Sequence, residues 1–117
     1  FDVVIKKNYL GGIIAPGVIL SLNTLSSKAS LIPPIELKSV DKILGNNTVR
    51  AVRSGFYWGY IGLVESILNK IIKQTNKKYK IIFTGGLSYL FKKGMNSKVF
   101  IDQDITIKGL LKTIKLI

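Results

Sequence analysis

The hydrophobic residues of this chain recur with two different periods, which predict both strands and helices. Residues 1–6 and 9–14 are rich in β-forming side chains on either side of Lys7-Asn8, and they predict a β-hairpin. Beyond Pro16, apolar residues spaced three and four apart predict a helix that extends to about Ser30. Pro16 suits the first position of that helix, because the first amide of a helix has no intrahelical partner in any case.

The longest periodic segment follows Asn46-Asn47-Thr48, three residues of the types that cap helix N-termini. One apolar line of this helix comprises Val49, Val52, Phe56, Tyr60, Leu63, Ile67 and Ile71, and the opposite side of its first half carries Tyr57, Trp58 and Ile61. A helix that is apolar nearly all round is buried on two sides. Two interpretations remain, a core helix of one domain or a subunit interface, and we favour the interface because glycines interleave with the aromatic residues.

The rest of the chain predicts shorter elements. They are a helical turn at Asp41–Leu44, a strand at 79–83, a helix from Gly86 to about Lys93, a strand at Val99–Ile101 and a last helix from Ile105 onward. The order β-β-α-α-β-α-β-α predicts an α/β fold with a mixed sheet flanked by helices. A length of 117 residues leaves room for one domain, residues 1–117.

Composition excludes several kinds of chemistry. The chain has no cysteine and no histidine, so it offers no disulfide, no thiolate nucleophile and no imidazole base or metal ligand. The uncharged run from Gly55 to Val64 is about half of the roughly 20 residues that a membrane span needs. We therefore expect a cytoplasmic protein without a membrane partner.

The chain starts with Phe1 inside a predicted strand, and we expect that an N-terminal portion precedes it.

The formal net charge of +12 raises the question of nucleic acid. All the basic residues except Arg50 and Arg53 are lysines, and they are scattered along the chain. Abundant Lys, Ile and Asn are also what an AT-biased coding sequence produces without selection for binding. We expect no nucleic-acid partner, and the charge is compatible with anionic metabolites such as nucleotides.

Two pairs of adjacent glycines follow predicted strands. Gly11-Gly12 lies within the segment Tyr9–Gly17, and Gly85-Gly86 follows Thr84. Glycine pairs in such places indicate close approach of backbone or of a ligand. Each pair alone more often reflects tight packing, but two strand–glycine–helix junctions in a short chain favour a fold that handles nucleotides or phosphates.

These motifs in their order resemble the type III pantothenate kinases, the Bvg accessory factor family within the actin-like ATPase superfold. The resemblance rests on Tyr9–Gly17, on Gly45-Asn-Asn-Thr48 followed by Ser54-Gly55, on Thr84-Gly-Gly86, and on Asp102 and Asp104 before Ile107-Lys-Gly-Leu110. It implies the C-terminal ribonuclease H-like domain of a longer two-domain kinase. The family's Asp-x-Gly-Asn-Thr, Gly-x-Asp-Arg and Val-Asp-x-Gly-Thr-Ala motifs do not occur in these residues, although Phe1-Asp2 looks like the end of the third.

The resemblance also implies roles for individual residues. Thr48 would reach across a dimer interface to pantothenate, although a simple helix cap is the alternative. Thr84, Gly85 and Gly86 would contact the adenosine side of ATP, whereas Gly11 and Gly12 would shape the fold. Asp102 would lie in a loop and Asp104 would cap the last helix.

The helix from Val49 to Ile72 would form the homodimer. No catalytic residue and no metal ligand is expected in this chain, since the general base would lie upstream; magnesium and a monovalent cation, potassium or ammonium, would complete the enzyme.

The leading hypothesis is therefore the C-terminal half of an ATP-dependent pantothenate kinase that is inactive by itself. Two alternatives from other classes stay open. One is a non-catalytic dimerising or regulatory module with the same fold, and the less favoured one is a basic nucleic-acid-binding domain.

Overall fold

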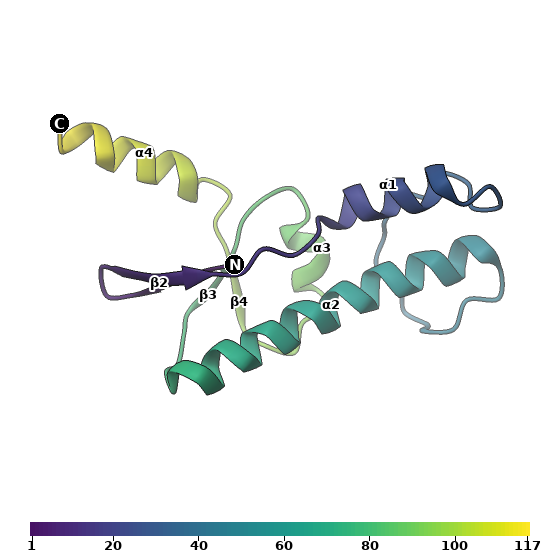
Figure 1. The fold of residues 1–117 in the computed structure, drawn as a ribbon, viewed down its shortest axis with the longest axis horizontal. Helices are drawn as coiled ribbons and strands as arrows, with labels where there is room; N and C mark the ends of the chain where they lie inside the picture. The colour runs from purple at the N-terminus through teal and green to yellow at the C-terminus, as the bar shows by residue number, and fades with distance from the viewer. The chain divides into compact units, whose positions relative to one another are not determined.

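The computed structural model describes all residues from 1 to 117 and divides them into two compact units, 1–35 and 36–117. The elements, labelled in Figure 1, are β1 (Asp2–Ile5), β2 (Asn8–Gly12), α1 (Val18–Lys28), α2 (Thr48–Thr75), β3 (Ile81–Phe83), α3 (Ser88–Lys92), β4 (Val99–Ile101) and α4 (Ile105–Lys115). This order confirms the predicted α/β succession. The organisation of 1–117 as a single domain stays a prediction, and each unit is described by itself.

The first unit begins with the predicted hairpin, in which β1 and β2 pair antiparallel from Asp2 opposite Gly12 to Ile5 opposite Asn8. A bulge interrupts the pairing, and Gly11 beside it has a φ of 140°, which residues with a side chain rarely adopt. A Cβ at Gly12 would lie 2.6 Å from the Phe1 carbonyl oxygen. Both glycines of this pair are therefore explained by the backbone of the hairpin.

Helix α1 starts two residues later than Pro16, so the prediction that Pro16 occupies the first helical position is wrong. Gly17 is the N-cap and is still extended, with φ −64° and ψ 137°, and the helical turn cannot start before Val18. Val18 and Leu22 are buried. The helix ends at Lys28, ahead of the predicted Ser30, because Ala29 is again extended.

The second unit contains α2, which begins at Thr48, one residue before Val49, and ends at Thr75, three residues beyond Ile72. Asn76 ends the helix in the left-handed conformation, with φ 51°. The helical turn predicted at Asp41–Leu44 is wrong, because this segment has no regular structure. Its backbone is held by α2 instead: the Ser54 hydroxyl donates a hydrogen bond to the Ile43 carbonyl, and Gly45 lies against the backbone of Ala51.

The face of α2 that is buried differs from the apolar line that periodicity singles out. Ser54, Tyr57 and Ile61 are the buried residues of the helix, whereas every residue of the apolar line from Val49 to Ile71 is half-buried. Gly94 explains why the Tyr57 face is the buried one, since a Cβ at Gly94 would overlap Ile61 and approach the Tyr57 hydroxyl to 2.8 Å. The close approach of Gly94 selects the Tyr57 face for packing.

Strands β3 and β4 run parallel, with Ile81 opposite Val99 and Phe83 opposite Ile101. Helix α3 lies between them in the chain, and its Phe91 ring stacks on Tyr57 at 6.1 Å. The strands thus pair in two two-stranded sheets, one antiparallel and one parallel, instead of the single mixed sheet expected. Strand β3 and helix α3 are also shorter than predicted. None of the helices has the length and apolar character that crossing a membrane requires.

Candidate functional site

The loop Thr84-Gly85-Gly86 lies at the carboxyl end of β3, next to the carboxyl end of the parallel strand β4. This edge of a parallel pair is where α/β proteins bind ligands. Gly85 has a φ of 96°, a conformation that favours glycine. Buried Ser88, the first residue of α3, donates to the Gly85 carbonyl from its amide at 3.2 Å and from its hydroxyl at 2.7 Å. The loop is thus tied to the start of α3.

Gly86 differs from Gly85 because nothing inside the chain requires a glycine there. Its φ lies outside the left-handed region, and a Cβ built on it would meet no atom within 4 Å. Thr84, Gly85 and Gly86 are all exposed. The bare backbone at Gly86 is therefore open to a molecule that approaches from solvent.

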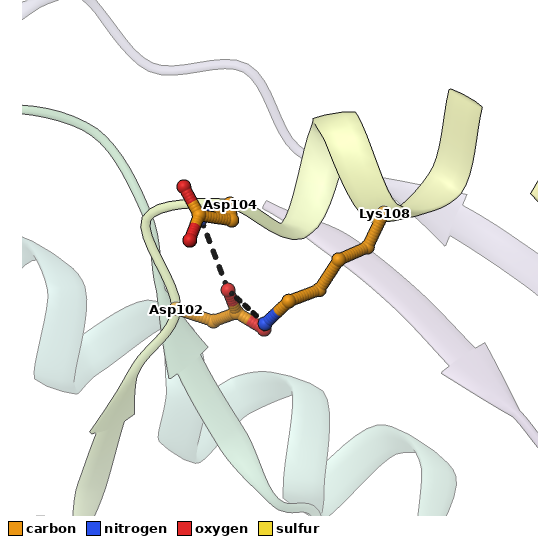
Figure 2. Close-up of polar contacts among 3 residues, drawn as sticks. All are labelled: Asp102, Asp104 and Lys108. Carbon is orange, nitrogen blue, oxygen red and sulfur yellow. Dashed lines mark hydrogen bonds and ion pairs between the residues drawn. The ribbon is translucent and has the colours of Figure 1, made fainter. Parts of the chain in front are cut away.

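The turn after β4 lies beside this loop and is held by a carboxylate. The Asp102 amide donates to the Phe83 carbonyl at 3.0 Å. The Asp102 side chain accepts from the Asp104 amide at 3.0 Å and from the Lys108 ammonium at 2.9 and 2.8 Å (Figure 2). The Lys108 hydrogen bond holds the pKa of the Asp102 carboxyl below its usual value, and the same contact raises the pKa of Lys108.

These contacts refine the expectation for the two aspartates. Asp104 does occupy the N-cap position of α4, but its side chain accepts no capping hydrogen bond. The carboxylate that accepts a backbone amide at this helix start is that of Asp102. Asp102 therefore orders the turn and pairs with Lys108, one helical turn into α4.

Gln103 connects the two loops, because its side-chain oxygen accepts a hydrogen bond from the Gly85 amide at 3.2 Å. Sequence analysis missed both Gln103 and Lys108. Gln103 could have been found only once the parallel pairing of β3 and β4 was known, since it then follows the second strand at the same edge as Thr84-Gly86. Lys108 lies within the motif Ile107-Lys-Gly-Leu110, but no feature of the sequence indicated that it pairs with Asp102.

Thr48 is exposed and is the first residue of α2. The N-cap is Asn47, whose side chain accepts from the Arg50 amide at 2.9 Å, so the interpretation of Thr48 as the cap is wrong. No hydrogen bond of the Thr48 hydroxyl is present in the structure, and the start of α2 is remote from β3 (Figure 1). The structure does not bring Thr48 together with the Thr84–Gly86 loop.

The acidic side chains of this chain do not gather into a cluster. No three acidic side chains come close enough together to hold a metal ion. Asp102, in the turn after β4, has both oxygens bound to Lys108.

The comparisons with known proteins agree with one another. A family model described as type III pantothenate kinase matches residues 1–70. The type III pantothenate kinase of Pelagibacter ubique is 56% identical over 117 residues, which are 100% of this chain and 47% of that protein. The corresponding kinase of Koribacter versatilis is 42% identical over 111 residues, 94% of this chain and 40% of that protein.

A solved structure shares the fold. It is a Baf family transcriptional activator from Campylobacter jejuni, with a TM-score of 0.66 and 22% identity over 97% of this chain and 51% of that one. The chain thus spans about half the length of the curated relatives it matches. The family model covers more than half of the chain, and the resemblance that the motifs indicated is confirmed. The chain belongs to the type III pantothenate kinase family.

Proposed function

We propose that these residues are the C-terminal half of an ATP-dependent pantothenate kinase. The enzyme would transfer the γ-phosphate of ATP to pantothenate and form 4′-phosphopantothenate, the first step of coenzyme A biosynthesis. Family membership supports this proposal, and so does coverage of about half of each relative. We assign the chain, as one domain, to the ribonuclease H-like, actin-like ATPase fold, and we assign the enzyme to the cytoplasm.

The observation that carries the proposal is the contrast between the two glycines after β3. Gly85 needs its backbone conformation, whereas Gly86 has no such need and no neighbour that excludes a side chain. A missing side chain that packing does not require is explained when another molecule lies against the backbone. We assign this place to the adenosine side of ATP, with Thr84 as the polar side chain beside it.

In the whole enzyme, the hydroxyl oxygen of pantothenate would attack the γ-phosphorus of ATP in line with the bond to the β–γ bridging oxygen. That bond breaks, ADP leaves, and the hydroxyl proton passes to a general base. We place the base and the phosphate loop outside these 117 residues, since their motifs do not occur in the sequence. Magnesium and a monovalent cation, potassium or ammonium, would neutralise phosphate charge there.

We assign Thr48 to pantothenate in the site of a second subunit. Its exposed hydroxyl, which is not needed as a helix cap, supports this role, and so does its distance from the Thr84–Gly86 loop. The homodimer would form through the helix from Val49 to Ile72. Gly55, Gly59 and Gly62 support this contact, because they are exposed and a Cβ on any of them would meet nothing within 4 Å.

One specific observation also supports an alternative function. A non-catalytic dimerising module of the same fold would also use the exposed glycines of α2, and it would need neither a base nor a phosphate loop. It predicts self-association without nucleotide binding. No comparable observation favours a nucleic-acid-binding domain.

A chimaera tests the proposal. In the 56% identical Pelagibacter kinase, the segment that aligns with this chain is replaced by residues 1–117. We expect the chimaera to consume ATP only when pantothenate is present, and the purified 117-residue chain to show no such turnover. A folded chimaera without turnover would favour the non-catalytic module. Turnover by the 117-residue chain itself would contradict the assignment of the base to residues outside it.

A further inference from the structure

Both polar groups of Gly85 are bound by side chains from other parts of the second unit. Its carbonyl accepts from Ser88, and its amide donates to the Gln103 side chain at 3.2 Å. Because Gly85 has no side chain and a φ of 96°, its own conformational preference does little to fix the direction of the peptide. The bond to Gln103 fixes the Thr84–Gly85 peptide through its N–H, whereas the amide and hydroxyl of Ser88 fix the Gly85–Gly86 peptide through its carbonyl.

Gln103 is able to do this because the backbone on either side of it is anchored. Before it, the Asp102 amide is bound to the Phe83 carbonyl, which continues the pairing of β4 with β3. After it, the Asp104 amide is bound to the Asp102 carboxylate, which Lys108 in turn holds from α4 (Figure 2). Gln103 thus projects from the apex of a turn with little freedom of its own.

We propose that Gln103 is a positioning residue of the nucleotide loop. It sets the orientation of the Gly85 peptide and, through it, the bare backbone of Gly86 against which the nucleotide lies. Gln103 acts through Gly85 and does not touch the reacting atoms. This inference rests on the proposed function for its consequence in catalysis, although the contact itself does not depend on that function.

Loss of the Gln103 hydrogen bond should affect the binding of ATP and not the binding of pantothenate. Loss of the acceptor at residue 103 leaves the Gly85 amide exposed to solvent and the Thr84–Gly85 peptide free to reorient, while Ser88 still holds the Gly85 carbonyl. Nucleotide binding then weakens, since the loop must be ordered when ATP arrives. Pantothenate binding should not change, because we assign it to Thr48 at the remote start of α2.

The test compares three variants of the chimaera. Gln103→Met removes the acceptor and keeps the side-chain length, Gln103→Glu keeps an acceptor, and Gln74→Met makes the same chemical change at an exposed position of α2. Hydrogen exchange of the Gly85 amide is followed by NMR after labelling with ¹⁵N-glycine, with the signal assigned by its loss in Gly85→Ala. We expect faster exchange of this amide in Gln103→Met only. Equal exchange in the wild type and Gln103→Met would overturn the positioning role.

Steady-state kinetics supply the second measurement. We expect Gln103→Met to raise the KM for ATP about fivefold, the equivalent of about 1 kcal/mol, with kcat and the KM for pantothenate unchanged. Gln74→Met should behave as the wild type. Faster Gly85 exchange with an unchanged KM for ATP would overturn the inference and leave the proposed function standing. An unsubstituted chimaera that is folded, protects Gly85 and does not turn over ATP would overturn the proposed function instead.

Discussion

Glu65, in the middle of α2, and Ser97, just before β4, are joined by two hydrogen bonds across 32 positions of the chain. The Ser97 hydroxyl donates to one carboxylate oxygen at 2.6 Å, and the Ser97 amide donates to the other at 2.9 Å. The Asn96 amide adds a third bond at 2.7 Å. One carboxylate therefore fixes the entry into β4, and with it the register that brings the turn after β4 to the Thr84–Gly86 loop.

Removal of this carboxylate should destabilise the second unit. We expect Glu65→Ala to lower the free energy of unfolding by about 2–3 kcal/mol, since hydrogen bonds to a charged group are lost and two amides remain without that acceptor. Urea denaturation of the wild type and the variant measures the difference. Glu36→Ala is the matched control, because the Glu36–Lys38 pair is exposed and should contribute less than about 1 kcal/mol. Equal losses in the two variants would contradict the role of Glu65.

The same carboxylate predicts a pH dependence of stability. Partial burial opposes ionisation of Glu65, but the hydrogen bonds from Ser97 and Asn96 outweigh it, and the pKa of the folded state lies below the ordinary value of 4.5. A lowered folded pKa stabilises the fold above the unfolded pKa, and the contribution is lost as the pH falls through the folded pKa. We expect Glu65→Gln to flatten the stability profile below about pH 4.5, measured by urea midpoints from pH 3 to 7. A variant that keeps the full acid slope of the wild type would show that other carboxyls cause it.

At the start of α2, helix capping and substrate binding are assigned to two neighbouring residues, Asn47 and Thr48. Asn47 is the cap, so Asn47→Ala should cost about 1 kcal/mol of stability, whereas Thr48→Ala should cost less than about 0.5 kcal/mol. In the chimaera, Thr48→Ala should raise the KM for pantothenate roughly tenfold, about 1.4 kcal/mol, and leave the KM for ATP unchanged. Thermal melts and steady-state kinetics decide between the two roles. A Thr48→Ala enzyme with normal pantothenate dependence would remove Thr48 from the site.

The glycines of α2 offer a cleaner test of the homodimer than its aromatic residues do. The indole nitrogen of Trp58 is buried, so a charge at that position would disturb the fold as well as an interface. A Cβ at Gly59 would meet no atom of the chain within 4 Å, and Gly59 is exposed. We expect Gly59→Gln to shift a dimer to a monomer in sedimentation. The folded monomer should gain about 0.5–1 kcal/mol, because glycine is unfavourable inside a helix. A dimer that persists in Gly59→Gln would place the interface elsewhere.

Local signals in the sequence were enough to predict α2 and β4. The capping residues at 46–48 marked the start of a long periodic helix, and the short apolar run Val99–Ile101 matched β4 residue for residue. The order of all elements followed from the same signals. Thr84-Gly85-Gly86 was also placed correctly at a strand end, because a glycine pair after an apolar strand is a local pattern.

Contacts between distant residues could not be predicted in this way. Both faces of the first half of α2 are apolar, and the approach of Gly94 and of the Phe91 ring decides that the Tyr57 face is buried. The bond from Gly85 to Gln103 spans 18 positions, and it depends on the parallel pairing of β3 and β4. The irregular segment Asp41–Leu44 depends likewise on Ser54, a hydroxyl from the next element.

The most direct test of the nucleotide site is the KM for ATP of the Gly86→Ala chimaera. Because a Cβ at Gly86 has free space inside the chain, the substitution should not lower the melting temperature, and Gly109→Ala is a control with equally open space in α4. We expect Gly86→Ala to raise the KM for ATP roughly tenfold, about 1.4 kcal/mol, with the KM for pantothenate unchanged and Gly109→Ala the same as wild type. An unchanged KM for ATP in a folded, active Gly86→Ala enzyme would contradict the account, since the nucleotide would then not lie against this loop.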